Sequence, residues 1–289
     1  MDQLLITVLS GVANGAVYGL VGLGLVIIFQ STDVMNFAMA AMATTASYLA
    51  LSMHNAGLAL AVAMVLAVGL ASAFGLAVRE VLIRPLGDGR LFAALVVTMG
   101  VAISTEHFVG QHWGEQPKSF PRLVDGSVAI GGSRINTQDL LIIGVAVVAM
   151  AGVAFLFTRT PLGSAMRAVA ESSETAAVLG INSQKVARIA WALGVGLATL
   201  GVLLYAPNAG LTPVVLAPVL FRAFAGILLG GLTSMTGAVV GGLVIGVLDN
   251  LAATYVSASF RDTFVFSIAV LVLLVRPQGM FGRQAFVRV

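Results

Sequence analysis

Long apolar runs alternate with short polar breaks along most of this chain. An α-helix needs about 20 predominantly apolar residues to cross the hydrocarbon core of a bilayer. Six runs reach that length, at residues 4–29, 34–53, 58–78, 91–110, 139–158 and 186–205. We therefore expect each of them to be a membrane-spanning helix, with Ser31, Thr32 and Asp33 offering the N-cap of the second.

The last third of the pattern is less regular. Residues 219–232 are apolar but only 14 long, and a polar break separates them from a glycine-rich run that continues to about 255. This pair forms either a short crossing followed by a full span or a partly re-entrant hairpin buried in protein. A final run covers 263–275. We expect an all-α, polytopic membrane helix bundle of about eight spans, between seven and nine, in one transmembrane domain over residues 1–289.

The breaks between the runs are predicted to be loops. Residues 79–90 form a short polar loop, and residues 111–137 form the longest one. The valine and isoleucine islands in the longer loop favour a short hairpin.

Composition supports a membrane protein. The chain is 59% hydrophobic and only 9% charged, whereas soluble domains carry about 25% charged residues. It has no cysteine, which excludes disulfides and thiolate metal sites. The net charge of +3 is better explained by basic membrane-flanking segments than by binding of nucleic acid.

Basic residues predict the orientation. Ten lie in loop 79–90, segment 159–188 and the tail, and four lie on the opposite side: Lys118, Arg122, Arg134 and Arg261. Because cytoplasmic segments carry the excess of lysine and arginine, we expect the N-terminus outside and the C-terminus in the cytoplasm.

Segment 159–188 is polar and helix-forming, unlike the other breaks. Pro161 suits a first helical turn. Arg167 and Glu171 can pair at i,i+4, and Ser173 can cap a second short helix that stops at Gly180, with Ile181 as its apolar follower. Exposed apolar residues in such a unit predict a covering partner. The alternative is an amphipathic helix that rests on the membrane interface.

A few polar side chains lie within the spans. Asn14, Asn36, Thr44 and Asp249 are candidates for a translocation path, although contacts with neighbouring helices explain them equally well. Gly11, Gly15 and Gly19 form a smooth strip that predicts a helix-packing seam, beside a pore or away from one. Arg222 and Asp249 are expected at similar depth and are predicted to form an ion pair. The alternative is that Arg222 extends to the membrane interface.

No catalytic or metal site is expected. Glu106 and His107 are adjacent, so their side chains point about 100° apart on a helix, and His112 lies beyond the expected helix end. The chain also has no Gly-x-x-x-x-Gly-Lys-[Ser/Thr] loop. We therefore expect no enzymatic activity and no cofactor in this chain, and any ATP hydrolysis must take place in a partner.

Several motifs resemble one family. The stretch from Glu171 to Asn182 looks like the coupling loop of ABC importer permeases, and short matches follow in order at 15–20, 34–38, 84–86, 119–121, 166–170, 229–232, 237–241 and 274–279. Together they resemble the permease subunits of branched-chain amino acid ABC importers. Candidate ATPase-coupling residues are then Arg167, Glu171, Glu174, Ala176, Ala177, Leu179, Gly180 and Ile181.

The resemblance implies partners and a location. This chain would pair with a second permease subunit, as a heterodimer, within the lipid of a bacterial inner membrane. Two cytoplasmic ATPase subunits, which hold ATP and Mg, and a soluble substrate-binding protein would complete the importer. Residues 159–188 would be the cytoplasmic coupling loop.

One departure affects the expected substrate. After Asn36, Phe37 and Ala38 the family usually has His-Gly and a Glu, but this chain continues with Met39 to Met42. Branched-chain or other hydrophobic amino acids are the expected cargo, with urea, amides or aromatic acids as alternatives within the family. A stand-alone secondary transporter or channel, or a purely structural membrane protein, are the alternatives outside it.

Overall fold

The computed structural model describes residues 2–87, 89–130, 133–214, 217–276 and 278–282. Arg283 and Arg288 of the basic tail, and Pro277 of the C-terminal motif, lie outside these residues. Six of the described helices are long and apolar enough to cross a membrane. The prediction of an all-α, multi-pass membrane bundle is confirmed.

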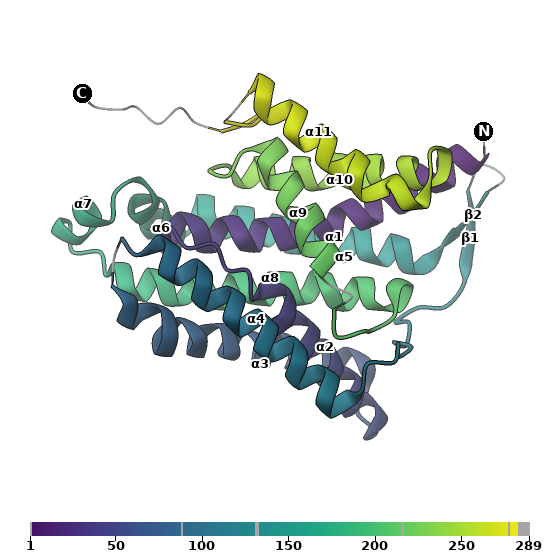
Figure 1. Cartoon of the computed structure of the whole chain (residues 1–289), viewed down its shortest axis with the longest axis horizontal. Coiled ribbons are helices and arrows are strands. Elements are labelled where there is room, and N and C mark those ends of the chain that lie inside the picture. The colour runs from purple at the N-terminus through teal and green to yellow at the C-terminus, as the bar shows by residue number, and fades with distance from the viewer. Residues whose placement is uncertain (1, 88, 131–132, 215–216, 277, 283–289) are drawn as a thin grey trace.

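The helices follow the expected order along the chain (Figure 1). The six candidate spans are formed by α1 Asp2–Thr32, α3 Leu60–Val78, α4 Leu91–Trp113, α5 Thr137–Arg159, α8 Ser183–Ala209 and α10 Met235–Tyr255. Helix α2, Met39–Asn55, has 17 residues and is not among them. The shorter ones are α6 Pro161–Glu171, α7 Ser173–Val178, α9 Ala217–Gly230 and α11 Arg261–Val275. Short 3-10 turns cover Arg84–Leu86 and Ala258–Phe260, and a π-helical turn covers Arg79–Ile83.

Helix α1 runs through the centre of the bundle and packs antiparallel against α10. Glycines line this contact on both helices. A Cβ atom placed on Gly246 would lie 2.2 Å from the Cα atom of Gly15, and one placed on Gly242 would lie 2.5 Å from the backbone nitrogen of Gly19. Small residues allow two membrane helices to touch through their backbones. The predicted packing seam is confirmed.

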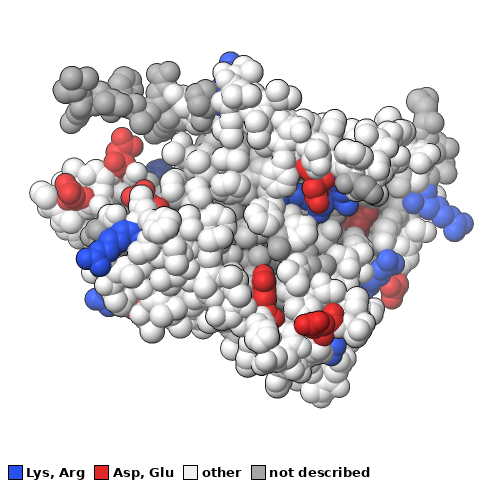
Figure 2. All heavy atoms as spheres, in the orientation of Figure 1, with Lys and Arg blue, Asp and Glu red and all other residues white. Residues whose placement is uncertain are grey.

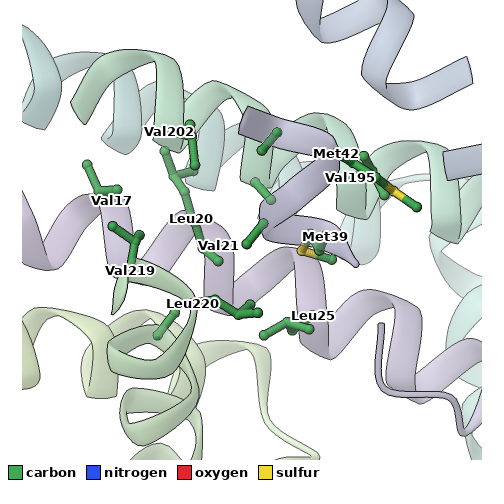
Figure 3. Packing of buried hydrophobic residues seen from close by; sticks show 14 of the residues in the cluster. Val17, Leu20, Val21, Leu25, Met39, Met42, Val195, Val202, Val219 and Leu220 are labelled. Atoms are coloured by element: carbon green, nitrogen blue, oxygen red, sulfur yellow. The ribbon is translucent and has the colours of Figure 1, made fainter. Parts of the chain in front are cut away.

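The core gathers around the same helix. Val17, Leu20, Val21 and Leu25 of α1 point into a fully apolar layer. Figure 3 shows this layer closed by side chains of three other helices, namely Met39 and Met42 of α2, Val195 and Val202 of α8, and Val219 and Leu220 of α9.

The predicted hairpin in the longest loop is confirmed. Strand β1 (Ser127–Ile130) pairs antiparallel with β2 (Ser133–Asn136), with Val128 opposite Ile135. The Asn136 side chain then caps α5 by accepting a hydrogen bond from the Gln138 backbone N–H. Figure 1 shows the hairpin and the N-terminus at one end of the bundle and α6 and α7 at the other.

The second span differs from its prediction. Its helix begins at Met39 instead of residue 34, and residues 34–36 have no helical structure. Ser31 and Thr32 do not cap it either, because α1 continues through Thr32, whose hydroxyl donates to the Ile28 carbonyl (2.8 Å).

Three other boundaries also differ from their predictions. Residues 79–86 continue α3 as π and 3-10 turns, so most of the expected polar loop is helical. Helix α4 reaches Trp113, which places His112 in its last turn, stacked on Phe108. Helix α8 continues to Ala209 with Pro207 inside it, because a proline near a helix end sacrifices only one backbone hydrogen bond.

The C-terminal segment returns to the end of α9. The backbone N–H groups of Met280 and Phe281 donate to the carbonyls of Leu229 and Gly230, each at 2.8 Å. The last carbonyls of a helix have no N–H partner inside it. The segment therefore supplies the hydrogen bonds that the end of α9 lacks.

Candidate functional site

The polar segment after α5 begins with a defined helix start. Pro161 occupies the first turn of α6, and the Thr160 hydroxyl accepts a hydrogen bond from the Gly163 backbone N–H (3.1 Å). The predicted start is confirmed. The second helix, α7, is capped by Ser172, whose hydroxyl accepts from the Thr175 N–H (3.2 Å). The expected cap at Ser173 was wrong by one residue, because a capping side chain reaches the N–H two or three positions ahead.

The second short helix of the segment stops at Gly180, as predicted. This glycine adopts φ +82°, a left-handed conformation that favours glycine. Its N–H donates to the Ala177 carbonyl (3.0 Å), and the Ile181 N–H donates to the Ala176 carbonyl (2.9 Å). This pair of bonds is the Schellman arrangement, which satisfies carbonyls at the helix end.

A small apolar cluster fixes the segment to the bundle. Met166, Val169 and Ala176 are buried in it, together with residues of α1, α5 and α8. Gly163 of α6 packs directly on the backbone of α5, since a Cβ atom on Gly163 would lie 2.2 Å from the Leu156 carbonyl oxygen. The inner face of α6 and α7 is therefore packed, and the segment is not a free loop.

The outer face of the segment carries exposed apolar side chains. Val178 is 87% exposed and Leu179 is 73% exposed. Most of the other candidate coupling residues are also exposed: Arg167, Glu171, Glu174, Ala177 and Gly180. Ala176 is buried and Ile181 is half-buried, so these two support the segment from inside.

One interaction expected in this segment has a different partner. Arg167 donates to the Ser164 hydroxyl (3.2 Å). The expected pair with Glu171 is not among the ion pairs of the described residues.

Glu80 connects the end of α3 to the start of α8. Arg188 donates to both of its carboxylate oxygens, from Nε at 3.0 Å and from Nη2 at 3.1 Å. Arg84 donates to it as well (3.0 Å), and so does Arg79, which also donates to Gln184 of α8. These contacts hold the two chain segments together next to α6 and α7.

A buried charge cluster joins α1, α9, α10 and α11. Arg222 Nε lies 3.3 Å from Asp249 Oδ1, and Arg222 Nη2 lies 2.6 Å from Asp262 Oδ1. Arg261 donates two hydrogen bonds to Asp249, and the Tyr18 hydroxyl donates a third (3.0 Å). The structure thus brings Arg222 and Asp249 together and adds Arg261 and Asp262 to them. The sequence had placed Arg261 on the outer side of the membrane.

The cluster is electrically balanced. It contains two arginines and two aspartates, and Asp249 is fully buried at its centre. Arg222 is only 7% exposed, so its guanidinium does not extend to the surface of the protein. Buried charges of this kind are stable only when each has a partner.

The candidate path residues do not gather on one surface. Asn14 donates to Asn250 of α10 (3.1 Å), and the Thr44 hydroxyl donates to the Ala40 carbonyl of its own helix (2.9 Å). Asp249 belongs to the charge cluster. Asn36 is the exception, because its side chain is fully buried and its amide nitrogen has no hydrogen-bond partner among the described residues. A translocation path through these four residues stays a prediction.

Charged atoms are few on the face drawn in Figure 2. They occur around α6 and α7 at one end and in several places toward the other, with broad neutral surface between. Within the described residues, no group of three His, Cys, Asp or Glu side chains is arranged to hold a metal ion.

Comparison with known proteins gives a consistent picture. Residues 7–275 match the model of a family described as branched-chain amino acid transport system / permease component. The chain is 29% identical to the high-affinity branched-chain amino acid transport system permease protein LivH of Salmonella typhimurium, over 95% of this chain and 94% of that protein. It is 28% identical to the corresponding protein BraD of Pseudomonas aeruginosa, with the same coverage.

A solved structure shares the fold. The chain is similar to a chain of PsaBC from Streptococcus pneumoniae in complex with Fab, with a TM-score of 0.52. The match covers 95% of this chain and 92% of that chain at 14% sequence identity, so it bears on the fold alone.

Proposed function

Because the chain belongs to the family of branched-chain amino acid transport system permease components, we propose that it is the membrane-spanning subunit of an ATP-driven importer. Its cargo is then branched-chain or other hydrophobic amino acids. The relatives named as permeases for branched-chain amino acids, which align over nearly the whole chain, support this assignment.

The segment from α6 to Gly180 is the proposed docking site for the ATPase subunits. The observation that carries this proposal is the exposure of Val178 and Leu179 on a segment whose other face is packed into the bundle. Two large, adjacent, exposed apolar side chains on a segment that is otherwise packed against the bundle favour a partner that covers them. The segment packs against α1, α5 and α8. A movement of the ATPase subunits that displaces the segment is therefore transmitted directly to the centre of the bundle.

The same proposal sets the other partners and the orientation. ATP and Mg are held by two cytoplasmic ATPase subunits, and a second, related permease subunit completes the path. A soluble binding protein delivers the amino acid at the opposite end, where the N-terminus and the hairpin lie (Figure 1). The excess of basic residues around α6 and α7 supports the cytoplasmic assignment of that end.

Substitution of Leu179 tests the docking site. Leu179→Ala is expected to weaken association with the ATPase subunits about 10-fold or more, because truncation of a central apolar anchor typically costs about 2 kcal/mol. Its side chain is exposed, so folding of this chain should not change. The measurement is co-purification and ATPase binding with the detergent-solubilised permease.

Val148→Ala is the matched control. Val148 of α5 has the same 73% exposure but lies on a membrane-length helix, so its loss should leave ATPase binding unchanged. Equal ATPase binding by wild type and Leu179→Ala would refute the proposed docking site.

Competition of labelled leucine uptake by urea, amides or aromatic acids separates the alternative cargoes.

A further inference from the structure

The chain between α1 and α2 enters the bundle without forming a helix. Val34, Asn36 and Ala38 are buried, and Asp33 adopts φ +54°. The hydroxyl of Thr98, two turns into α4, donates to the Leu95 carbonyl of its own helix (2.9 Å) and lies 3.4 Å from the Met35 carbonyl oxygen. Figure 1 shows that α2 consequently starts part-way along the bundle, away from the end at which α6 and α7 lie. Non-helical backbone at this depth is tolerated only where it is buried in protein or lines a cavity.

The start of α2 leaves backbone donors unused. The first bond of the helix runs from the Met42 N–H to the Ala38 carbonyl (2.9 Å). Among the described residues, no acceptor meets the N–H groups of Ala40 and Ala41, which precede it. Both residues are buried. These N–H groups sit at the positive end of the helix dipole, where negative charge is stabilised.

Asn36 adds a third donor at the same place. Its Oδ1 accepts from the Ala38 N–H (3.0 Å), so its amide group lies against the first turn of α2. The Nδ2 group beside that oxygen is fully buried and has no partner in the described chain. An unsatisfied buried donor is unfavourable, so this group favours an acceptor that the described chain does not supply.

An apolar pocket adjoins this segment. Met35 lines it together with Leu25 and Phe29 of α1 and Phe224 and Ile227 of α9. Its volume is about 10 Å³, which is room for one water molecule. The pocket is therefore closed in this conformation and must widen before it admits a side chain. The pocket would widen by separation of the segment before α2 from α9. The rings of Phe37 in that segment and Phe224 of α9 lie 6.3 Å apart.

We infer that the α-carboxylate of the transported amino acid binds at the N-terminus of α2, between Asn36 Nδ2 and the N–H groups of Ala40 and Ala41. The aliphatic side chain then occupies the widened pocket beside Met35. This inference rests on the proposed transport of amino acids. It gives α2 a way to recognise an anion through its backbone, since residues 39–42 bring no charged or amide side chain to the site. Interrupted membrane helices bind anionic groups at their N-termini in the same manner.

Asn36→Asp tests the site with little change in shape. The aspartate keeps an oxygen for the Ala38 N–H and remains a good helix cap, but it replaces the free donor with a negative oxygen. In proteoliposomes that contain the complete importer and its binding protein, uptake of radiolabelled L-leucine is expected to fall about 10- to 100-fold, the range for loss of a hydrogen bond to a charged group. ATP hydrolysis by the assembled complex in the absence of binding protein should remain.

Ser47→Ala is the matched control on the same helix. The Ser47 hydroxyl already donates to the Ala43 carbonyl and is buried, so its removal should leave leucine uptake near the wild-type rate. If Asn36→Asp fails to assemble, Asn36→Ser takes its place, because serine also caps a helix but carries no amide donor. Leucine uptake by Asn36→Asp or Asn36→Ser at the wild-type rate, with normal assembly, would overturn the inference.

Two further outcomes distinguish a carboxylate site from a failed transport assignment and from a site for an inorganic anion. A wild-type complex that transports no amino acid contradicts the proposed function itself, whereas transport that is indifferent to Asn36 removes only the carboxylate site. Replacement of chloride by gluconate on both sides of the membrane identifies the source of the anion. Unchanged uptake supports the substrate carboxylate, and uptake that requires chloride assigns the donors to an inorganic ion and overturns the inference.

Discussion

Gly246→Leu is expected to prevent the protein from folding in the membrane. A Cβ atom at this position would lie 2.2 Å from both Cα and N of Gly15, which are backbone atoms and cannot rotate away. Helices α1 and α10 must separate to admit the side chain, and α1 is the centre of the bundle. We expect a loss of more than about 3 kcal/mol, above the usual range for an overpacked core. The amount of monodisperse protein after solubilisation and its melting temperature measure the effect.

Gly144→Leu provides the comparison for this prediction. Gly144 lies in α5 with no atom within 4 Å of an added Cβ, so the same leucine meets open space there. The variant should be produced and should melt like the wild type. Similar behaviour of both variants would mean that α1 and α10 do not touch through their glycines.

Asp249→Asn is expected to produce the second large effect. The side chain is fully buried and receives hydrogen bonds from Arg261 and Tyr18, with Arg222 beside it. Asparagine keeps the volume but leaves a buried cluster with an uncompensated positive charge. Removal of one partner from a buried ion pair typically costs about 3–5 kcal/mol. The melting temperature of the purified chain should therefore fall sharply.

Asp262→Asn should be much milder. Asp262 contacts the same Arg222, but its side chain is 62% exposed, so water replaces much of the lost interaction. Exposed ion pairs contribute about 0–1 kcal/mol. If the two asparagine variants were destabilised equally, the cluster would be as solvated as a surface pair.

The sequence anticipated features that depend on local chemistry. The apolar runs located the long helices, since a bilayer demands a minimum length. Pro161 and Gly180 marked the limits of the segment between α5 and α8, because each suits one backbone conformation that the structure contains. Arg222 and Asp249 were paired from their expected depth, and the structure places them in contact.

Features that depend on distant partners escaped prediction. Glu80 and Arg188 lie 108 residues apart in sequence, and each alone looked like an ordinary membrane-flanking charge. The interruption before α2 was missed for a different reason. Val34, Met35 and Phe37 are apolar in a helix and outside one, so hydropathy does not distinguish the two states. The structure shows the break in the φ of +54° at Asp33 and in the bond from the Ala38 N–H to the Asn36 side chain.

The return of the C-terminal segment to α9 has a consequence for biosynthesis. The carbonyls of Leu229 and Gly230 accept hydrogen bonds from the N–H groups of Met280 and Phe281, which are synthesised after α10 and α11. Helix α9 therefore lacks these two bonds until both later helices have left the ribosome. A chain that stops before Met280 lacks the contact altogether.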